Sequence, residues 1–214
     1  GDRTYQDVAE GRDPRFANTV VWNGSVMMSG GDKDHVVYTH KGVGSTTDAF
    51  GSGTPTGYYI RKFSHRQLAG NWFVGTSQAF DLIRYAEILL NYAEALNEVE
   101  GSYEIPSWNG ETMYTITRSA TALKEGIQPI RIRAGLPDYE VYDDVKKFRF
   151  KVKRERQIEL FAEGHRFFDI RRWCDAPVEE ALPIYGCNIY LTSENPDSFH
   201  TPIEVASLPT MFTT

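Results

Sequence analysis

One segment constrains the fold more than any other, residues 80–99, with the sequence FDLIRYAEILLNYAEALNEV. Apolar or small residues recur along it every three or four positions, at Ala79, Leu82, Ala86, Leu89, Ala93 and Leu96. This spacing puts them on one face of an α-helix, and Ile83 and Leu90 widen that face. Asp81 suits the positive end of the helix dipole, and Gly101 is a typical stop after the last turn. The segment therefore predicts a long helix with one buried face.

The buried face of this helix is rich in small side chains. Ala86 and Ala93 lie a heptad apart, and Ala95 lies beside them. Small residues allow a partner helix to approach closely, as in proteins built from repeated helical hairpins. An ordinary core helix of an all-α domain would show the same stripe, and nothing in the stripe is catalytic.

Composition limits the class of protein. Hydrophobic residues make up 41% of the 214 residues and aromatic residues 13%, so the chain can bury a core and is not disordered. The net charge is −6, which argues against a nucleic-acid partner. No apolar run is long enough to span a membrane. The chain begins at Gly1 and shows no signal peptide, so we expect a processed chain or a piece of a longer one.

Residues 1–78 differ from the rest because glycines are dense and the apolar residues form only short runs. Short strands are predicted at 15–22, 35–40 and 58–63, with turns and ordered loops between them. Such scattered apolar residues could not close a core alone. We expect this loop-rich portion to pack on a helical scaffold.

The rest of the chain is predicted to be helical up to residue 174. After the first long helix, 102–113 is expected to be a loop, followed by a short helix at 117–125 that Gly126 and Pro129 limit. Asp143 or Asp144 can cap a second long helix that ends at Phe161, and 166–173 continues as a short helix. Five prolines make the tail, 175–214, mostly irregular. The predicted class is mainly α, with a helical portion at 79–174, a large irregular portion and a few short strands.

The second long helix carries a row of like charges. Glu155, Glu159 and Glu163 are spaced at i, i+4 and i+8, so they repel one another on one face. Arg156 can reach Glu159, but one cation does not balance three carboxylates. Further partners are available among the other arginines, namely Arg131, Arg133, Arg166, Arg171 and Arg172. A catalytic acid/base cluster is an alternative, but a buried structural ion network is the favoured interpretation.

Three segments in order, AEILLNYAEALNE, IRIRAGLP and RERQIELFAEGHRFFDIRRW, resemble the RagB/SusD family of outer-membrane lipoproteins from Bacteroidetes. The last segment is the most specific, and RDPRF and TGYYIRKF are weaker matches upstream. The resemblance covers roughly residues 12–175.

The resemblance implies a superhelix of TPR-like helical hairpins that carries a loop-rich, substrate-binding part. It also implies a surface lipoprotein of the outer membrane, without enzymatic activity or cofactor, that caps a SusC-like TonB-dependent transporter and holds oligosaccharides or sometimes peptides. The chain lacks the family's N-terminal half with its lipidated cysteine, and it lacks the usual closing segment. We therefore expect one SusD-like domain that is incomplete at both ends.

Tryptophans in loops are the candidate binding residues. A sugar presents C–H faces edged with hydroxyl groups, so its sites combine flat aromatic rings with amide or charged groups. Trp22, Trp72 and Trp108 lie in loop-like stretches, each beside an asparagine, and the predicted ligand-binding residues are Trp22, Asn23, Trp72 and Trp108. Each tryptophan could instead simply anchor its loop to the scaffold. Trp173 closes the DIRRW motif, where the resemblance makes it a core or network residue.

Other sites have weaker signals. The acidic segment 30–34 lacks the full ligand series of an EF-hand, and no zinc spacing, GxSxG motif or P-loop is present. We therefore predict no catalytic residue and no metal site. Cys174 and Cys187 could form a disulfide or remain free thiols. Two other functions stay open: a peptide- or protein-binding helical scaffold, and a glycoside hydrolase, which would need two carboxylates facing each other across a cleft.

Overall fold

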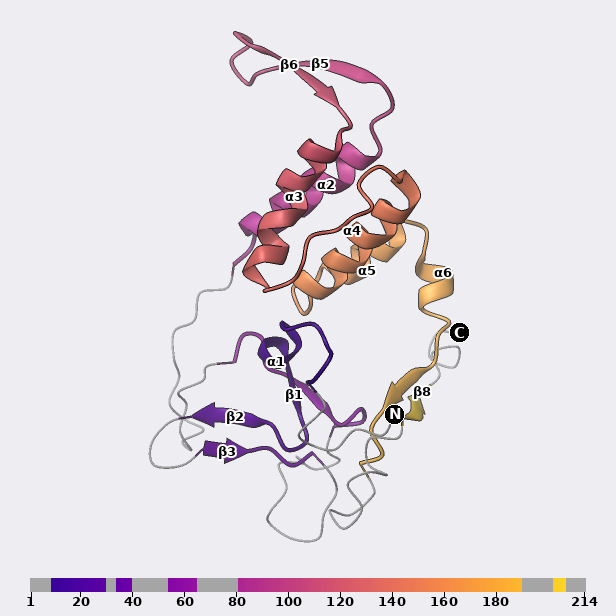
Figure 1. Cartoon of the computed structure of the whole chain (residues 1–214). Helices are drawn as coiled ribbons and strands as arrows, with labels where there is room; N and C mark the ends of the chain where they lie inside the picture. Colours follow the sequence, from indigo (N-terminus) through magenta and orange to yellow (C-terminus); the bar gives the residue numbers. More distant parts are fainter. Residues whose placement is uncertain (1–8, 30–33, 40–53, 65–80, 190–201, 207–214) are drawn as a thin grey trace. The chain divides into compact units, whose positions relative to one another are not determined.

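The computed structural model describes residues 9–29, 34–39, 54–64, 81–189 and 202–206. The chain divides into two compact units. The helical unit is Phe80–Arg166, and the mixed unit combines Gly1–Ala79 with Phe167–Thr214. The described residues contain six helices and eight short strands (Figure 1). A mainly helical, loop-rich class agrees with this content, and the boundaries at 78/79 and 174/175 stay a prediction.

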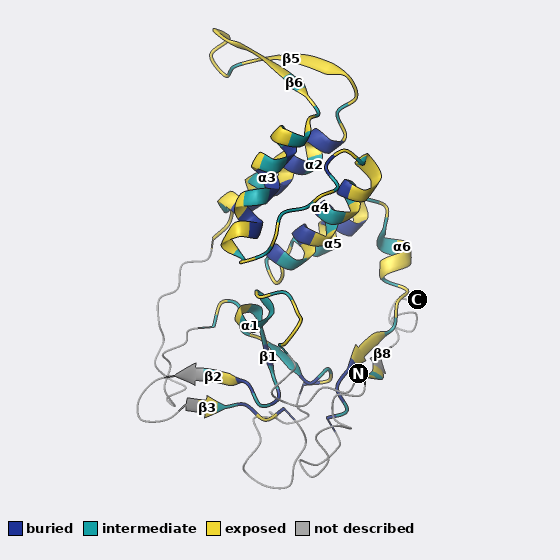
Figure 2. Ribbon diagram, in the orientation of Figure 1, coloured by how far each residue is buried: buried dark blue, intermediate teal, exposed yellow. Residues whose placement is uncertain are grey.

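Three helices build the helical unit: α2 (Tyr85–Asn97), α3 (Ala120–Arg133) and α4 (Val145–Glu159). Helices α2 and α3 are antiparallel, because the residue before α2, Arg84, and the last residue of α3, Arg133, meet at one carboxylate. Side chains from all three helices and the adjoining loops form one continuous core, made of Ala86, Leu90, Ala93, Leu96, Leu123, Ile127, Ile130, Tyr142, Phe148, Val152 and Leu160. The buried sides of these helices appear dark blue in Figure 2.

Helices α2 and α3 touch through small residues, as the alanine-rich face predicts. A Cβ atom added to Gly126 would lie 2.8 Å from the Ala93 Cβ and 2.8 Å from the Leu89 carbonyl oxygen. No larger side chain fits between the two backbones there without displacing one of them. The predicted close approach of a partner helix is confirmed, and the partner is the next helix in the chain.

The predicted helix at 80–99 begins too early. Helix α2 starts at Tyr85, because Arg84 has extended backbone angles (φ −128°, ψ 158°). Leu82 and Ile83 precede the helix and are 85% and 71% exposed, so they do not extend the buried stripe. The acidic residue of the first turn is Glu87, and Asp81 lies outside the helix.

The helix expected at 117–125 is much longer in the structure. It starts at Ala120 with Ser119 as N-cap, whose side chain accepts a hydrogen bond from the Ala122 N–H at 3.2 Å, and it runs on to Arg133. Gly126 does not end it, since this glycine lies in the close contact with α2. Pro129 removes only one backbone hydrogen bond, and it lies on the exposed side, where water can solvate the freed carbonyl.

The loop expected at 102–113 is a β-hairpin. Strand β5 (Ser102–Pro106) pairs with β6 (Met113–Thr117) in antiparallel register. The hairpin extends beyond the ends of α2 and α3, and almost all of it is exposed (Figures 1 and 2). Its base is fixed to the helices by Ile116, which packs on the core, and by Arg118, which donates to the Tyr142 carbonyl oxygen at 2.6 Å.

The second long helix agrees closely with the sequence. Asp144 is the N-cap of α4 and accepts a hydrogen bond from the Lys147 N–H at 3.0 Å. The helix ends at Glu159, two residues before the predicted end. The predicted helix at 166–173 is α5 (His165–Arg172).

The described part of the mixed unit contains most of α5 and a set of short elements. They are α1 (Phe16–Thr19), β1 (Val20–Trp22), β2 (Val26–Ser29), β3 (Asp34–Val36), β4 (Tyr58–Ile60), α6 (Ala176–Glu179), β7 (Ile184–Gly186) and β8 (Ile203–Ala206). The strands form three separate antiparallel pairs, β1 with β4, β2 with β3 and β7 with β8. The tail is therefore less irregular than its prolines suggest.

The predicted strands of this unit are each shorter than expected. In 15–22, Asp13 turns the chain by accepting a hydrogen bond from the Arg15 N–H at 3.0 Å, and the chain makes one helical turn before β1 begins. The strand predicted at 58–63 stops at Ile60, and Phe63, in the turn that follows, has a positive φ of 73°. The strand at 35–40 is present as β3, and His40 lies outside the described residues.

Candidate ligand-binding surface

Glu155 and Glu159 of α4 are buried, and they and Glu163, which follows the helix, are paired with arginines, as the sequence predicts. Glu155 is 1% exposed, and its Oε2 accepts hydrogen bonds from Arg131 Nη1 at 3.0 Å and from the Tyr139 hydroxyl at 2.7 Å. The Arg131 guanidinium also stacks over the Tyr139 ring, 3.9 Å from its centre. These contacts tie α4 to α3 and to the loop after it.

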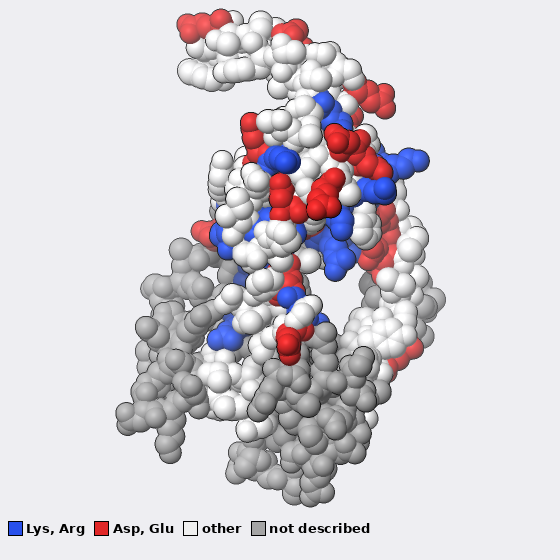
Figure 3. Space-filling view, in the orientation of Figure 1, with Lys and Arg blue, Asp and Glu red and all other residues white. Residues whose placement is uncertain are grey.

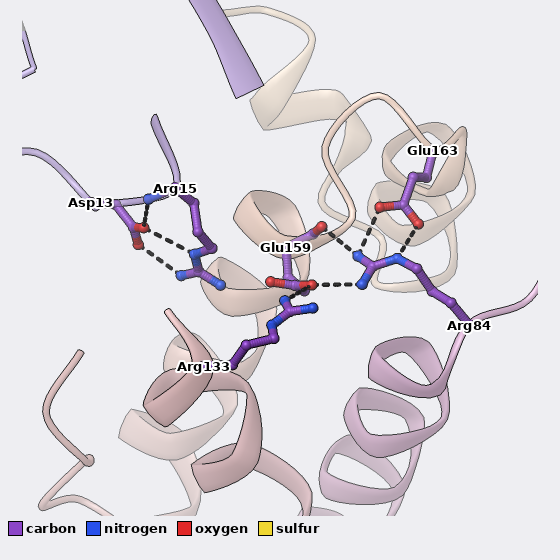
Figure 4. Close-up of polar contacts among 6 residues, drawn as sticks. All are labelled: Asp13, Arg15, Arg84, Arg133, Glu159 and Glu163. Carbon is purple, nitrogen blue, oxygen red and sulfur yellow. Dashed lines mark hydrogen bonds and ion pairs between the residues drawn. The ribbon is translucent and has the colours of Figure 1, made fainter. Parts of the chain in front are cut away.

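The other two glutamates share one arginine (Figure 4). Arg84 donates to Glu159 Oε1 at 2.6 Å and to the two carboxylate oxygens of Glu163 at 2.6 and 2.7 Å. Arg133 donates to the same Glu159 oxygen. Glu159 is 4% exposed, so both partners reach a carboxylate that water scarcely contacts. Arg84, the residue before α2, is not among the partners that the sequence predicted.

This network joins helices and offers little to a substrate. Each of the three carboxylates already accepts from at least one guanidinium. Arg156, 3% exposed on its side chain, extends the network to α2 through Asn91 at 2.6 Å and Glu94 at 3.5 Å. A general acid or base must exchange a proton with a substrate within hydrogen-bond reach. The geometry therefore favours a role of these carboxylates in holding the helices together.

Trp108 has the surroundings of a binding residue. It lies in the loop between β5 and β6, and its side chain is 98% exposed. Hydrogen bonds within the loop hold the backbone on both sides of it: the Ser107 N–H donates to the Thr112 carbonyl oxygen at 2.7 Å, and the Gly110 N–H donates to the Ser107 carbonyl oxygen at 2.9 Å. A tryptophan this exposed on an ordered loop buries almost none of its ring against its own protein. It is therefore a candidate platform for a ligand.

The asparagine beside Trp108 shapes the loop. Asn109 Oδ1 accepts hydrogen bonds from the Ser107 hydroxyl at 2.7 Å and from the Glu111 N–H at 3.2 Å, and Gly110 has a φ of 74°. Asn-Gly between alternating apolar residues is the strongest short-range signal of a hairpin. The sequence contained this signal in 102–117, together with alternating apolar positions at Tyr103, Ile105, Tyr114 and Ile116, and the loop prediction missed it.

Trp22 and Asn23 lie in the mixed unit, at the end of β1. The Trp22 ring packs against Phe16 with 5.3 Å between ring centres. Asn23 is 1% exposed, and its Oδ1 accepts a hydrogen bond from the Thr39 N–H at 2.8 Å. These contacts resemble those of a residue pair that anchors a loop. Trp72 lies outside the described residues.

The match to a family model decides the family. A model of the SusD family matches residues 2–214, which is almost the whole chain. The chain belongs to the SusD family. Among curated proteins, it is similar to SusD-like protein P2 of Formosa agariphila, with 35% identity over 117 residues. That region is 54% of this chain and 21% of the relative, so the match spans well under half of the relative's length.

Within this SusD-family chain, the described residues give no sign of a metal site or a membrane span. They contain no cluster of three or more His, Cys, Asp or Glu side chains that could hold a metal ion. No helix in the described ranges has the length and apolar character needed to cross a bilayer. The acidic segment considered for calcium, 30–34, lies almost wholly outside them. Both cysteines are free thiols, with Cys174 exposed and Cys187 buried.

Proposed function

We propose that this chain is part of a glycan-binding, non-catalytic subunit of a nutrient importer at the outer-membrane surface. The observation that carries the proposal is the match of residues 2–214 to the SusD family. The arginine-paired glutamates of α4 support the non-catalytic role, because a hydrolase would need accessible carboxylates on the two sides of a cleft. The partner is a SusC-like TonB-dependent transporter, and the protein is held at the membrane as a lipoprotein.

In this proposal the helical unit is a TPR-like scaffold. The antiparallel pair α2–α3, with its close contact at Gly126, is the kind of helical hairpin that such repeats stack. Ligand affinity comes from loop tryptophans, and Trp108 has the most favourable exposure among those described. Trp22, Asn23 and Trp72 remain predicted ligand-binding residues, and the buried Asn23 would act by shaping its loop.

The test is to run the full chain through gels that contain soluble polysaccharides and to assay the same mixtures for new reducing ends. Retardation without new reducing ends supports a binding protein. New reducing ends would contradict the non-catalytic role and indicate a glycoside hydrolase. Absence of retardation in every polysaccharide, combined with binding to a peptide library, would replace the proposal with a peptide-binding scaffold.

The contribution of Trp108 is tested with Trp108→Ala in the same gels. Removing an aromatic platform should cost roughly tenfold or more in affinity, while the melting temperature stays unchanged because the side chain contacts little of its own protein. Trp22→Ala is the comparison. Unlike Trp108→Ala, this substitution should lower the melting temperature, because the Trp22 ring packs on Phe16.

A further inference from the structure

One face of the β5–β6 hairpin is apolar and exposed. Residues paired directly across an antiparallel ladder point to the same side, so Tyr103 with Ile116 and Ile105 with Tyr114 form one face. Tyr103 is 55% exposed, Ile105 49% and Tyr114 54%. Only Ile116, at the base, packs on the core of the helical unit. About half of the surface of each of the outer three residues therefore faces water.

The opposite face of the hairpin is polar over the half nearer its base, and Pro106 and Met113 complete it beside the loop. The Thr115 hydroxyl donates to Glu104 at 2.7 Å, and the Thr117 hydroxyl donates to the Ser102 hydroxyl at 3.1 Å. The two faces therefore differ in polarity between Ser102–Ile105 and Tyr114–Thr117. A two-stranded hairpin with nothing on its apolar face is only marginally stable in water. A ligand that covers the face would stabilise it.

Charge narrows the chemistry of such a ligand. Residues 102–117 contain two acidic residues, Glu104 and Glu111, and no Lys, Arg or His, so the segment has a net charge of −2. Figure 3 shows the hairpin as mostly uncharged surface with acidic patches. A sulfated or uronic-acid glycan, like an anionic lipid surface, would meet repulsion here and no balancing cation. Among glycans, which are neutral or anionic, this surface therefore fits a neutral one.

We infer that Tyr103, Ile105 and Tyr114, together with Trp108, form a binding strip for a neutral glycan chain that lies along the hairpin. The inference rests on the proposed glycan-binding function and specifies where and what the protein binds. Tyr103 and Tyr114 are diagonal neighbours on one face, about 7–8 Å apart, so one extended chain can contact both rings. Aromatic rings stack on the C–H faces of sugars, and the tyrosine hydroxyls can bond to sugar hydroxyls.

The loop hydrogen bonds support this assignment of Trp108. Ser107 and Asn109 hold the turn through their side chains, so its backbone is ordered before a ligand arrives. A preordered site loses less conformational entropy on binding. Preordering matters most for neutral sugars, because they form no ion pair that could offset the loss of conformational entropy on binding.

The experiment is calorimetry on the full chain with maltoheptaose, cellohexaose, xylohexaose and laminarihexaose, and with hexagalacturonate as the anionic comparison. The neutral sugar that binds best is then titrated into Tyr103→Ala and Tyr114→Ala. Each variant should lose roughly tenfold in affinity. Thr115→Ala, on the polar face of the same strand, is the matched control and should stay within about twofold of the parent. A fourth variant replaces residues 103–115 with a short Gly-Ser turn and keeps Ile116, and it should abolish binding.

Far-UV circular dichroism and the melting temperature accompany each titration, so that a loss of affinity counts only in a folded variant. If the parent chain binds none of the five sugars, the inference falls together with the proposed function. If the parent binds but the shortened variant and both tyrosine variants bind equally well, the strip is wrong and glycan binding stands. Tighter binding of hexagalacturonate than of every neutral sugar would overturn the neutral class.

Discussion

Replacing Glu159 with glutamine tests whether the buried ion network stabilises the fold. The substitution keeps the shape of the side chain and removes its charge, where Arg84 and Arg133 both donate to one oxygen. Breaking an isolated buried ion pair costs about 3–5 kcal/mol, because it leaves the other charge buried and unpaired. The substitution leaves neither Arg84 nor Arg133 both buried and unpaired, so the expected loss of unfolding free energy is smaller.

The two arginines contribute unequally. Arg133 is 60% exposed on its side chain and can turn to water, so its loss is worth no more than about 1 kcal/mol. Arg84 is 20% exposed and keeps Glu163, so losing its charged bond to Glu159 costs about 1.5–3 kcal/mol. The amide oxygen of glutamine can still accept one hydrogen bond. We therefore expect Glu159→Gln to lower the free energy of unfolding by about 2–3 kcal/mol.

Urea unfolding followed by circular dichroism measures this loss, and the melting temperature should fall by roughly 5–10 °C for a chain of this length. The control is Glu98→Gln, which breaks the exposed pair with Arg149 and should cost about 1 kcal/mol or less. If Glu159→Gln is no more destabilising than Glu98→Gln, the carboxylate is not part of a buried network. The reasoning from its burial and its two partners would then be refuted.

Three further predictions concern packing, pH and thiol chemistry. Gly126→Ala should destabilise the fold, because overpacking against α2 costs about 1–3 kcal/mol and the gain in helix propensity is at most about 1 kcal/mol; urea unfolding measures the difference. Hydrogen bonds from Arg149 lower the pKa of Glu98 below its ordinary value of 4.5, so this stabilisation is complete above that pH and is lost as the pH falls through the lowered pKa. Arg149→Gln should therefore reduce the difference in stability between neutral pH and about pH 3. Burial raises the pKa of the Cys187 thiol, so Ellman's reagent should modify Cys174 first and reach Cys187 only in denaturant; equal rates in the native state would contradict this.

The parts of the fold that were predicted correctly depend on patterns repeated over several turns. The apolar stripe of α2, the Asp144 cap of α4 and the burial of Glu155 each follow from residues that are close in sequence. Three like charges on one helix face cannot satisfy one another, so opposite charges had to come from other elements.

The parts that were missed depend on contacts between distant residues or on an overlooked local signal. Arg84 was not expected as a partner of Glu163, because 79 positions separate them and nothing local connects the two. Gly126 was taken as a helix stop because its propensity is low, whereas packing against Ala93 makes it necessary inside the helix. The hairpin, unlike these two contacts, has a local sequence signal, the pair Asn109-Gly110. Its strands were overlooked because Pro106 and Gly110 were taken as signs of a loop.

The motif that is typical of the family says little about the ligand, because its charged side chains hold helices together. The segment RERQIELFAEGHRFFDIRRW supplies Glu155, Glu159 and Glu163, and the structure uses all three to bind arginines of other segments. Side chains committed to holding helices together must keep their identity whatever the protein binds. Beyond its base, the hairpin between α2 and α3 has no comparable ion network, and its outer hydrophobic residues are about half exposed or more. If the proposed strip binds the glycan, changes in that hairpin would alter the ligand without disturbing the ion network, and specificity would lie there and not in the motif.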